Sequence, residues 1–355
     1  MTQAQDLAVL IGRFQPFHRG HQALLQLALA QARHVAVVIG SAFQARTPKN
    51  PFTWRERADV IRLMLGAADQ ERVSFLPVRD HYDEARWVRD VQAGVHGLAE
   101  GLCPGHRARI ALVGHAKDAT SDYLNHFDGW ALMAAPRQHA VDGTHIRDAY
   151  FSHAGKRVEA TLAALVETVP DTTLAFLQAW AALPHFAELA KEWEMLQRYK
   201  AAWATAPYPP VFVTVDAVVK CANHVLLIQR AQAPGAGLWA LPGGFIEQRE
   251  TTYQSALREL REETRLRLLD STMQHALKAR AVFDHPDRSQ RGRTITHAFF
   301  FDLGERALPE VQADDDAQAA TWLSMAQLPD LEDRFHDDHF HILDHFLGLT
   351  PVPAG

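Results

Sequence analysis

Two short motifs, more than two hundred residues apart, constrain the fold of this chain more than any other feature. The first, Gly12-Arg13-Phe14-Gln15-Pro16-Phe17-His18-Arg19-Gly20-His21, directly follows the apolar run Leu7 to Ile11. The second begins at Gly244 and ends in Arg258-Glu259-Leu260-Arg261-Glu262-Glu263. Each motif needs its own scaffold, so the sequence predicts two domains in tandem. The length of 355 residues suits that number, at roughly 100 to 200 residues per domain.

Composition excludes several classes of protein. Hydrophobic content is 47% and charged content 22%, so each half can bury a core. The formal charge of -6 argues against a broad nucleic-acid surface. Cys103 and Cys221 have no metal or redox spacing and are expected to be free thiols. Because we find neither a signal peptide nor an apolar run that could span a bilayer, we expect a cytoplasmic protein without a membrane partner.

Strand-like and helix-like segments alternate in the first half. The expected strands are Leu7–Ile11, Val35–Ile39, Val73–Val78 and Ile110–Val113, and the expected helices are His21–Arg33, Thr53–Leu65 and Trp87–Leu98. That alternation predicts an α/β fold, a doubly wound, mostly parallel sheet of Rossmann-like type. Ligands should then gather beyond the carboxyl ends of the strands.

The second half has a different order of elements. Strands are expected at Val211–Val219, Val225–Gln229 and Thr296–Asp302, with one strong helix at Thr251–Thr264, which predicts an α+β domain. Proline residues 207, 209 and 210 should stop the preceding helix. We therefore expect a first domain at 1–185, a connecting helix at 186–206 and a second domain at 207–355.

His18 and His21 lie where the first strand should pass into a helix. Amides at a helix start carry partial positive charge, which suits a phosphate, and two imidazoles can donate hydrogen bonds to a phosphoryl group. Gly12 lets the backbone approach a nucleotide. The string resembles the HxGH nucleotidyltransferase superfamily. The resemblance implies that His18 and His21 are catalytic and that Gly12, Arg13 and Phe14 bind the substrates.

Other segments are similar to the archaeal-type nicotinamide mononucleotide adenylyltransferases. They are Gly40-Ser41-Ala42, Asn50-Pro51-Phe52-Thr53 with Arg55-Glu56-Arg57, and Gly143-Thr144-His145-Ile146-Arg147. The resemblance implies that Asn50, Arg55, Thr144 and Arg147 bind ATP or nicotinamide mononucleotide. Asp142 stands where the family has a serine, so only Thr144 and Arg147 are carried over from that motif. Thr144 also suits a helix N-cap, and both roles can hold together.

Three further residues of the first domain have two interpretations each. Trp87 aligns with a region where the family stacks an aromatic ring on the nicotinamide, but a core tryptophan explains it nearly as well. Lys117 and Asp118 follow the strand Ile110–Val113. Lys117 could steady a phosphate and Asp118 a ribose, and the alternative is a solvated turn.

Glu259, Glu262 and Glu263 lie at i, i+3 and i+4 and share one helical face. Three like charges side by side are unfavourable, and we expect a bound Mg²⁺ (or Mn²⁺) to relieve their repulsion and to bridge them to substrate phosphates. Arg258, one turn before Glu262, can orient that carboxylate. With Leu241-Pro242-Gly243-Gly244-Phe245 and Glu250, the spacing resembles the Nudix box, whose members hydrolyse nucleoside diphosphates linked to another moiety.

Arg265 departs from that pattern, which has glycine two residues after the last glutamate. The glycine commonly takes a left-handed conformation at the helix end, and arginine there costs on the order of 1 kcal/mol. Substrate choice is encoded less sharply. The segments Pro209–Asp216 and Arg291–Ala298 resemble the Nudix half of bifunctional adenylyltransferase/ADP-ribose pyrophosphatases. Gly244, Arg291 and Arg293 are the candidate ADP-ribose-binding residues. The two arginines could pair with substrate phosphate, or could be solvated.

Two polar clusters are given the less specific interpretation. The tail Phe335-His336-Asp337-Asp338-His339-Phe340-His341 could suggest a metal site, but the apolar stripe beside it favours a packed terminal helix with histidines on its polar side. Asp314-Asp315-Asp316 is expected to be a solvated loop, although such a loop could supply a general base.

Together the motifs predict a bifunctional enzyme of NAD metabolism. The first domain should convert nicotinamide mononucleotide and ATP to NAD⁺ and pyrophosphate, and the second should cleave ADP-ribose to AMP and ribose 5-phosphate. Its partners would be these small molecules, with a homo-oligomer left open. One alternative keeps the folds but changes the adenylyl acceptor and the nucleoside diphosphate. Another makes the Nudix half a non-catalytic ADP-ribose sensor, against which the complete carboxylate set argues.

Overall fold

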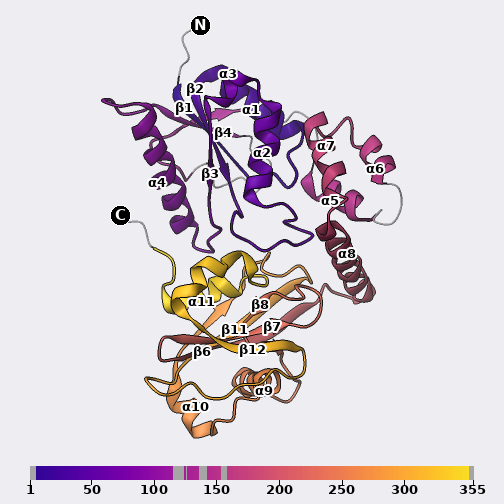
Figure 1. The fold of residues 1–355 in the computed structure, drawn as a ribbon, viewed down its shortest axis with the longest axis vertical. Coiled ribbons are helices and arrows are strands. Elements are labelled where there is room, and N and C mark those ends of the chain that lie inside the picture. Colours follow the sequence, from indigo (N-terminus) through magenta and orange to yellow (C-terminus); the bar gives the residue numbers. More distant parts are fainter. Residues whose placement is uncertain (1–4, 115–123, 125, 136–141, 153–157, 352–355) are drawn as a thin grey trace. The chain divides into compact units, whose positions relative to one another are not determined.

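The computed structural model describes residues 5–114, 124, 126–135, 142–152 and 158–351 (Figure 1). The described chain divides into two compact units, one up to residue 191 and one of residues 192–351. The division falls inside α8 (Pro184–Ala202), which overlaps the expected connecting segment. None of the described helices is long and apolar enough to cross a membrane.

The first unit contains a five-stranded sheet in which every pairing is parallel. The strand order is β3-β2-β1-β4-β5. The strands are β1 (Gln5–Gly12), β2 (Ala32–Ile39), β3 (Val73–Pro77), β4 (Ile110–Gly114) and β5 (Ala131–Ala134). The expected doubly wound fold is confirmed. The short strand β5 was not expected, because most of its residues are exposed and give no buried apolar run.

Helices cover both faces of this sheet, and β1 distributes its side chains between them. Ala8 and Leu10 belong to the core cluster that includes Leu25 of α1 (Arg19–Gln31) and residues of α2 (Trp54–Met64). Leu7 and Val9 belong to the cluster formed with α4 (Glu84–Leu102), which lies on the other side of the sheet in Figure 1. The remaining helices are α3 (Ala67–Gln70), α5 (Gly143–Ser152), α6 (Val158–Ala164) and α7 (Asp171–Trp180).

Asp6 ties the start of β1 to the start of β4. Its carboxylate accepts hydrogen bonds from the Arg109 amide at 3.0 Å and from Arg109 Nε at 3.1 Å. These bonds lower the pKa of Asp6 to about 2. A carboxylate with a lowered pKa stabilises the fold above its unfolded pKa, and that contribution is lost as the pH falls toward the folded value.

Asp6→Asn should therefore lower the free energy of unfolding of the first unit at pH 7 by about 1 kcal/mol, because solvent screens the half-exposed Arg109. Thermal unfolding of both proteins between pH 7 and pH 2 measures the difference, which should shrink as the pH falls. Asp59→Asn is the matched control, since Asp59 pairs with Arg62 on an exposed helix surface. An equal effect of the two substitutions at pH 7 would contradict this assignment.

The second unit is built on a mixed sheet in the order β10-β11-β6-β7-β12. Its strands are β6 (Val211–Cys221), β7 (His224–Arg230), β10 (Leu277–Phe283), β11 (Arg293–Asp302) and β12 (Ala317–Ser324). Strands β6 and β11 are parallel, and the other pairs are antiparallel. The short strands β8 (Trp239–Ala240) and β9 (Gly243–Phe245) pair with β7 and β6.

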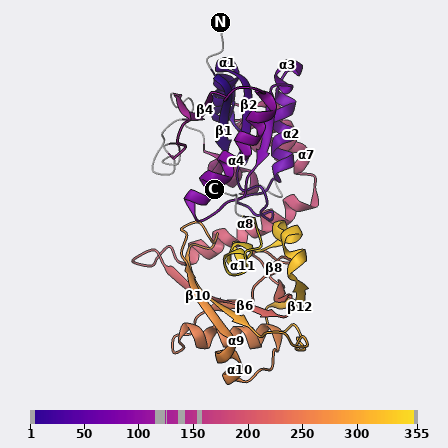
Figure 2. The same cartoon turned by 90° about the vertical axis from the view of Figure 1, so that its left-hand side faces the viewer.

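Helices α9 (Thr252–Thr264) and α10 (Asp270–Ala276) lie on one side of this sheet and α11 (His339–Leu347) on the other (Figures 1 and 2). The 3₁₀ helix η2 (Met325–Arg334) connects β12 to α11. Leu257 and Leu260 of α9 pack into the core cluster that contains Phe299 of β11. Both cysteines are buried free thiols, as expected.

Candidate active sites

The two motif histidines stack on each other at the start of α1. Their ring centroids are 3.6 Å apart at 20°, and His18 is the extended N-cap residue of the helix. The His18 backbone amide donates to His21 Nδ1 at 3.3 Å. A neutral imidazole that accepts through Nδ1 carries its proton on Nε2. The local fold therefore fixes the tautomer of His21 and makes its Nε2 a hydrogen-bond donor.

The loop before these histidines is held by side chains from distant segments. The Gln15 side chain donates to the Phe52 carbonyl at 2.8 Å and accepts from the Phe52 amide at 3.1 Å. Arg147 of α5 donates to the Gln15 carbonyl at 2.6 Å and to Thr144 Oγ1 at 3.1 Å. The structure thus brings the loop of the first motif together with the segment Gly143–Arg147.

Positive charge gathers at the same place. Burial, together with the charge of exposed Arg13, lowers the pKa of Arg147 to about 10. Burial lowers the pKa of Arg57 to about 10 as well, against the opposite effect of Asp80 and Glu56, and Arg13 adds to the lowering. An anion beside Arg13 and Arg147 would offset the cost of holding these positive charges close together. The electrostatics of this edge of the sheet therefore favour a polyphosphate ligand.

The other predicted residues of the first domain vary in their setting. Phe14 is in the core, so only its backbone is available to a nucleotide, and Asn50 is buried with its Nδ2 donating to Gln44 at 2.6 Å. Arg55 is exposed over the Trp54 ring at 4.9 Å. Half-buried Trp87 packs against the cluster on the α4 face. Lys117 and Asp118 lie outside the described residues.

Asp142, and not Thr144, caps α5. Its Oδ1 accepts the Thr144 amide at 2.7 Å, and its carbonyl accepts the Ile146 amide at 3.3 Å. The expectation that Thr144 is the N-cap is therefore wrong. Aspartate at the family's serine position supplies the cap, which leaves the Thr144 hydroxyl beside Arg147.

Two residues of this site, Arg57 of the quoted Arg55-Glu56-Arg57 segment and Asp80, were given no role from the sequence. Arg57 donates to the backbone carbonyls of Arg13, Gly40 and Ser41, at 2.5, 2.8 and 3.0 Å, and so joins the ends of β1 and β2. Asp80 accepts from the Ser41 amide at 3.0 Å and from Ser41 Oγ at 2.5 Å. Both side chains bind backbone atoms that are distant in the sequence, so no local sequence pattern indicates these contacts.

In the second unit, Arg258 organises the carboxylates of α9. It donates through Nη1 to Glu259 at 2.9 Å and to Glu262 at 2.8 Å, and through Nε to Glu250 at 3.0 Å. The predicted orientation of Glu262 by Arg258 is confirmed. The expectation that a bound metal ion is what relieves the carboxylate repulsion is wrong for Glu259 and Glu262, because Arg258 already lies between them.

Glu263 lies apart from that arginine. It is 4% exposed, and its Oε2 accepts the Gly243 amide at 2.8 Å. Burial raises the pKa of Glu263 to about 8 and also raises the pKa of Glu259. A side chain on Gly244 would place its Cβ 2.6 Å from Glu259 Oε1, so glycine is needed at that position for the carboxylate to lie there.

Among the described residues, no group of three or more His, Cys, Asp or Glu side chains is arranged to hold a metal ion. The donor set nevertheless fits a hard divalent cation. The carboxylates of Glu259 and Glu263 lie directly against the backbone of Gly244 and Gly243, because neither glycine has a side chain that would separate them. Burial disfavours their charge, which a divalent cation would stabilise.

The arginines predicted to bind ADP-ribose occupy two different settings. Arg291 lies over the ring of Phe245, the residue after Gly244, at 5.6 Å. Its charge helps to lower the pKa of Arg230, His336 and His339. Arg293 donates to the Asp284 carbonyl and thereby joins the ends of β10 and β11. Arg291 is therefore the better placed of the two for a phosphate near the glycine segment.

The tail histidines are not all on a polar face. His336 is 4% exposed, and the side chain of His339 is 12% exposed. His339 Nδ1 accepts the Leu241 amide at 2.8 Å. The terminal helix is confirmed as packed, but the expected polar placement is wrong for these two residues. The apolar stripe predicts the helix correctly and does not reveal that His339, at its first position, and His336, just before it, are largely buried.

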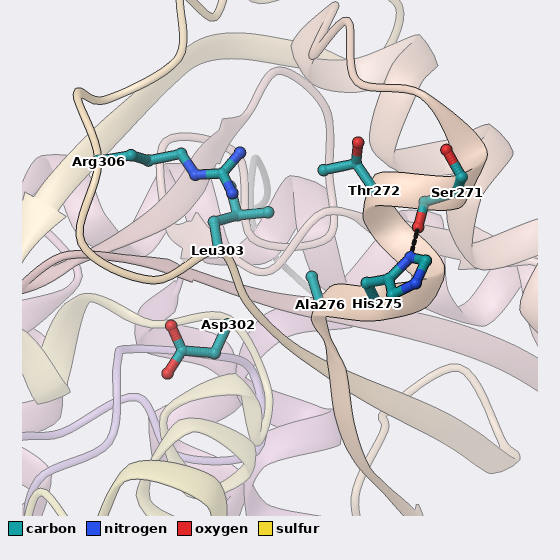
Figure 3. Close-up of a pocket in the computed structure, with 7 residues that line it drawn as sticks. All are labelled: Ser271, Thr272, His275, Ala276, Asp302, Leu303 and Arg306. Atoms are coloured by element: carbon teal, nitrogen blue, oxygen red, sulfur yellow. Dashed lines mark hydrogen bonds between the residues drawn. The ribbon is translucent and has the colours of Figure 1, made fainter.

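A cavity of about 310 Å³ lies elsewhere in the second unit (Figure 3). It is lined by residues of α10, by Asp302 at the end of β11 and by residues of the segment that follows, among them His275 and Arg306. None of the predicted site residues lines it. We therefore do not assign it to the candidate hydrolase site.

Arg265 adopts the left-handed conformation expected there, with φ 50°. Its Nε donates to Asp314 at 2.8 Å between half-exposed side chains, which offsets part of the backbone cost.

Arg265→Gly should raise the free energy of unfolding of the second unit by about 0.5 kcal/mol. This is the backbone strain that the glycine relieves minus the stabilisation that is lost with the ion pair. Asp314→Ala, the matched control, should lower it slightly in chemical denaturation. Destabilisation by both substitutions alike would count against this account.

Comparison with known proteins identifies both domains. Residues 211–346 match the NUDIX domain family, and residues 9–92 match the cytidylyltransferase-like family. The fold and sites thus define a nucleotidyltransferase domain joined to a Nudix hydrolase domain. A nicotinamide/nicotinic acid mononucleotide adenylyltransferase of Acinetobacter baylyi is 34% identical over 197 residues, 55% of this chain and 94% of that protein. An ADP-ribose pyrophosphatase of Methanocaldococcus jannaschii is 36% identical over 119 residues, 34% of this chain and 65% of that protein.

Two solved structures match both domains at once, and one of them illustrates the similarity. This one is a bifunctional NMN adenylyltransferase/ADP ribose pyrophosphatase from Francisella tularensis, complexed with AMP and a manganese ion. Its TM-score is 0.86 at 34% identity, and the match covers 97% of this chain and 99% of that chain. The chain belongs to the family of bifunctional NMN adenylyltransferase/ADP-ribose pyrophosphatases.

Proposed function

We propose that the first domain transfers the adenylyl group of ATP to nicotinamide mononucleotide. The mononucleotide phosphate oxygen attacks the α-phosphorus, a new P–O bond forms, and the bond to the β-phosphate breaks to release pyrophosphate. His18 and His21 at the start of α1 donate hydrogen bonds to the phosphoryl oxygens. Arg13 and Arg147 offset the charge of the polyphosphate. Asn50, Arg55, Thr144, Trp87, Lys117 and Asp118 are proposed as further contacts to the two substrates.

The second domain is proposed to hydrolyse ADP-ribose to AMP and ribose 5-phosphate. Glu259, Glu262 and Glu263 would hold Mg²⁺ or Mn²⁺, which would supply a Lewis acid for the diphosphate. Arg258 holds Glu259 and Glu262 in place, and the Gly243 amide holds Glu263. Arg291 is proposed to bind a substrate phosphate. Reduced, buried thiols suit the proposed cytoplasmic setting.

Both assignments rest on the end-to-end similarity to one bifunctional enzyme. This chain also has the histidine pair of the first motif and the carboxylates of the second. The test is a product assay on the purified full-length chain with Mg²⁺ or Mn²⁺. One reaction contains ATP and nicotinamide mononucleotide, and the other contains ADP-ribose alone. NAD⁺ with pyrophosphate, and AMP with ribose 5-phosphate, are the expected products. A different preferred acceptor, such as a phosphopantetheine-type phosphate, or a different preferred diphosphate would contradict the proposal.

A further inference from the structure

Residues 241–244 form a short segment held against the candidate metal site by three elements. Gly243 pairs with Asp216 of β6, and its amide donates to Glu263 of α9. The Leu241 amide donates to His339 Nδ1 of α11 at 2.8 Å. Helices α9 and α11 lie on opposite sides of the sheet (Figures 1 and 2), so the segment is bonded from both.

The spacing of these bonds follows from Pro242. Proline has no amide hydrogen, so the stretch 241–243 has donors only at Leu241 and Gly243. Each of those donors meets a side-chain acceptor, one from His339 and one from Glu263. The segment also has little freedom to shift toward β6, because a Cβ on Gly243 would lie 2.1 Å from the Val215 carbonyl oxygen.

The His339 ring suits the role of a permanent acceptor. Because its Nδ1 accepts an amide hydrogen, the neutral ring carries its proton on Nε2. Burial lowers the pKa of His339 to about 3. The charge of Asp338 opposes this shift, and the charges of Arg288, Arg230 and Arg291 add to it. Nδ1 is therefore unprotonated near neutral pH.

We propose that His339 is a positioning residue of the hydrolase site, which fixes the 241–244 segment so that the Gly243 amide meets Glu263 and Gly244 lies against Glu259. This inference rests on the proposed function of the second domain. It assigns a role in the metal site to the C-terminal helix, which lies 98 residues from Leu241 in the sequence. Groups that orient metal ligands typically account for 10- to 100-fold in metal affinity.

The test compares two substitutions of equal shape in the full-length chain. His339→Asn keeps an acceptor near the Nδ1 position, and His339→Leu removes it. Mn²⁺ alone is the probe, and free Mn²⁺ is followed by electron paramagnetic resonance. The binding that is lost in Glu263→Gln defines the hydrolase-site component. His345→Gln is the matched control, because His345 lies on the same helix with an exposed side chain.

We expect His339→Leu to weaken Mn²⁺ binding at this site at least tenfold and to lower ADP-ribose turnover accordingly, with His339→Asn within about threefold of wild type. Adenylyl transfer should be unchanged in both. Equal Mn²⁺ affinities in the leucine variant and wild type, or equal losses in both variants, would overturn the inference. If circular dichroism shows that the leucine variant is unfolded, His339→Phe takes its place. Absence of ADP-ribose hydrolysis in the wild type contradicts the proposed function, and the Mn²⁺ comparison still decides the role of His339.

Discussion

Glu263→Gln should lower ADP-ribose hydrolysis by on the order of 10² to 10³ while raising the melting temperature of the metal-free second domain. Hydrolysis falls because a neutral amide is a poor ligand for Mg²⁺. The metal-free fold gains because Glu263 is 4% exposed and burial raises its pKa to about 8, so its charge is unfavourable there. The glutamine oxygen can still accept the Gly243 amide.

Glu262→Gln should lower hydrolysis as well, but it should not stabilise the metal-free protein. The Glu262 carboxylate bonds Arg258, and its side chain is 46% exposed, so the substitution loses a surface ion pair worth a few tenths of a kcal/mol. The two variants thus separate the two environments on one helix face. Charge repulsion between neighbours predicts the same gain for both, and burial predicts a gain only for Glu263.

Calorimetric melting with and without Mg²⁺ measures both effects. Mg²⁺ should raise the wild-type melting temperature more than that of either variant, because a ligand stabilises only the state that binds it. Synthesis of NAD⁺ serves as the internal control and should stay unchanged. Equal Mg²⁺ shifts in the three proteins, or full hydrolysis by the variants, would refute the assignment of these carboxylates to the metal.

The sequence predicted the framework of both domains because burial imposes a simple pattern on it. Strands β1 and β2 are covered on both faces and appear as apolar runs, and α9 repeats its apolar residues at helical spacing. Strand β5 is mostly exposed and short, and β9 is three residues of glycine and phenylalanine. Neither leaves a periodic signal.

The site residues divide in the same way. Motif residues such as His18 and Glu263 could be predicted because the polar side chains of each motif lie within a few positions of one another in the sequence. Asp216 and His339 could not, because each meets its partners through the fold. Asp216 accepts a hydrogen bond from Thr296 Oγ1 at 2.6 Å, and Thr296 is 80 residues away in the sequence. The residues beside Asp216 in β6 are mostly apolar. A buried aspartate within an apolar strand is the one signal that could have singled it out.

Alanine in place of His18 or His21 should lower the rate of NAD⁺ synthesis by roughly 10² or more, the scale of losing a preorganised donor to developing charge. ATP binding should change much less, since Arg13 and Arg147 remain. ADP-ribose hydrolysis is the internal control and should be unaffected. A trapped adenylyl-enzyme, or unimpaired turnover in both alanine variants, would rule out direct attack of the mononucleotide on ATP.

Two further variants of His21 separate its structural role from its catalytic role. His21 Nδ1 accepts the His18 amide at the helix start, and its Nε2 carries the proton offered to substrate. Asparagine places its side-chain oxygen near the position of Nδ1, and glutamine places its amide nitrogen near Nε2. His21→Asn should therefore keep the melting temperature of the first domain and lose turnover as alanine does. His21→Gln should keep more turnover than His21→Asn at equal or lower stability. The reverse order of turnover would mean that His21 serves the reaction by shaping the start of α1 and donates nothing to the phosphate.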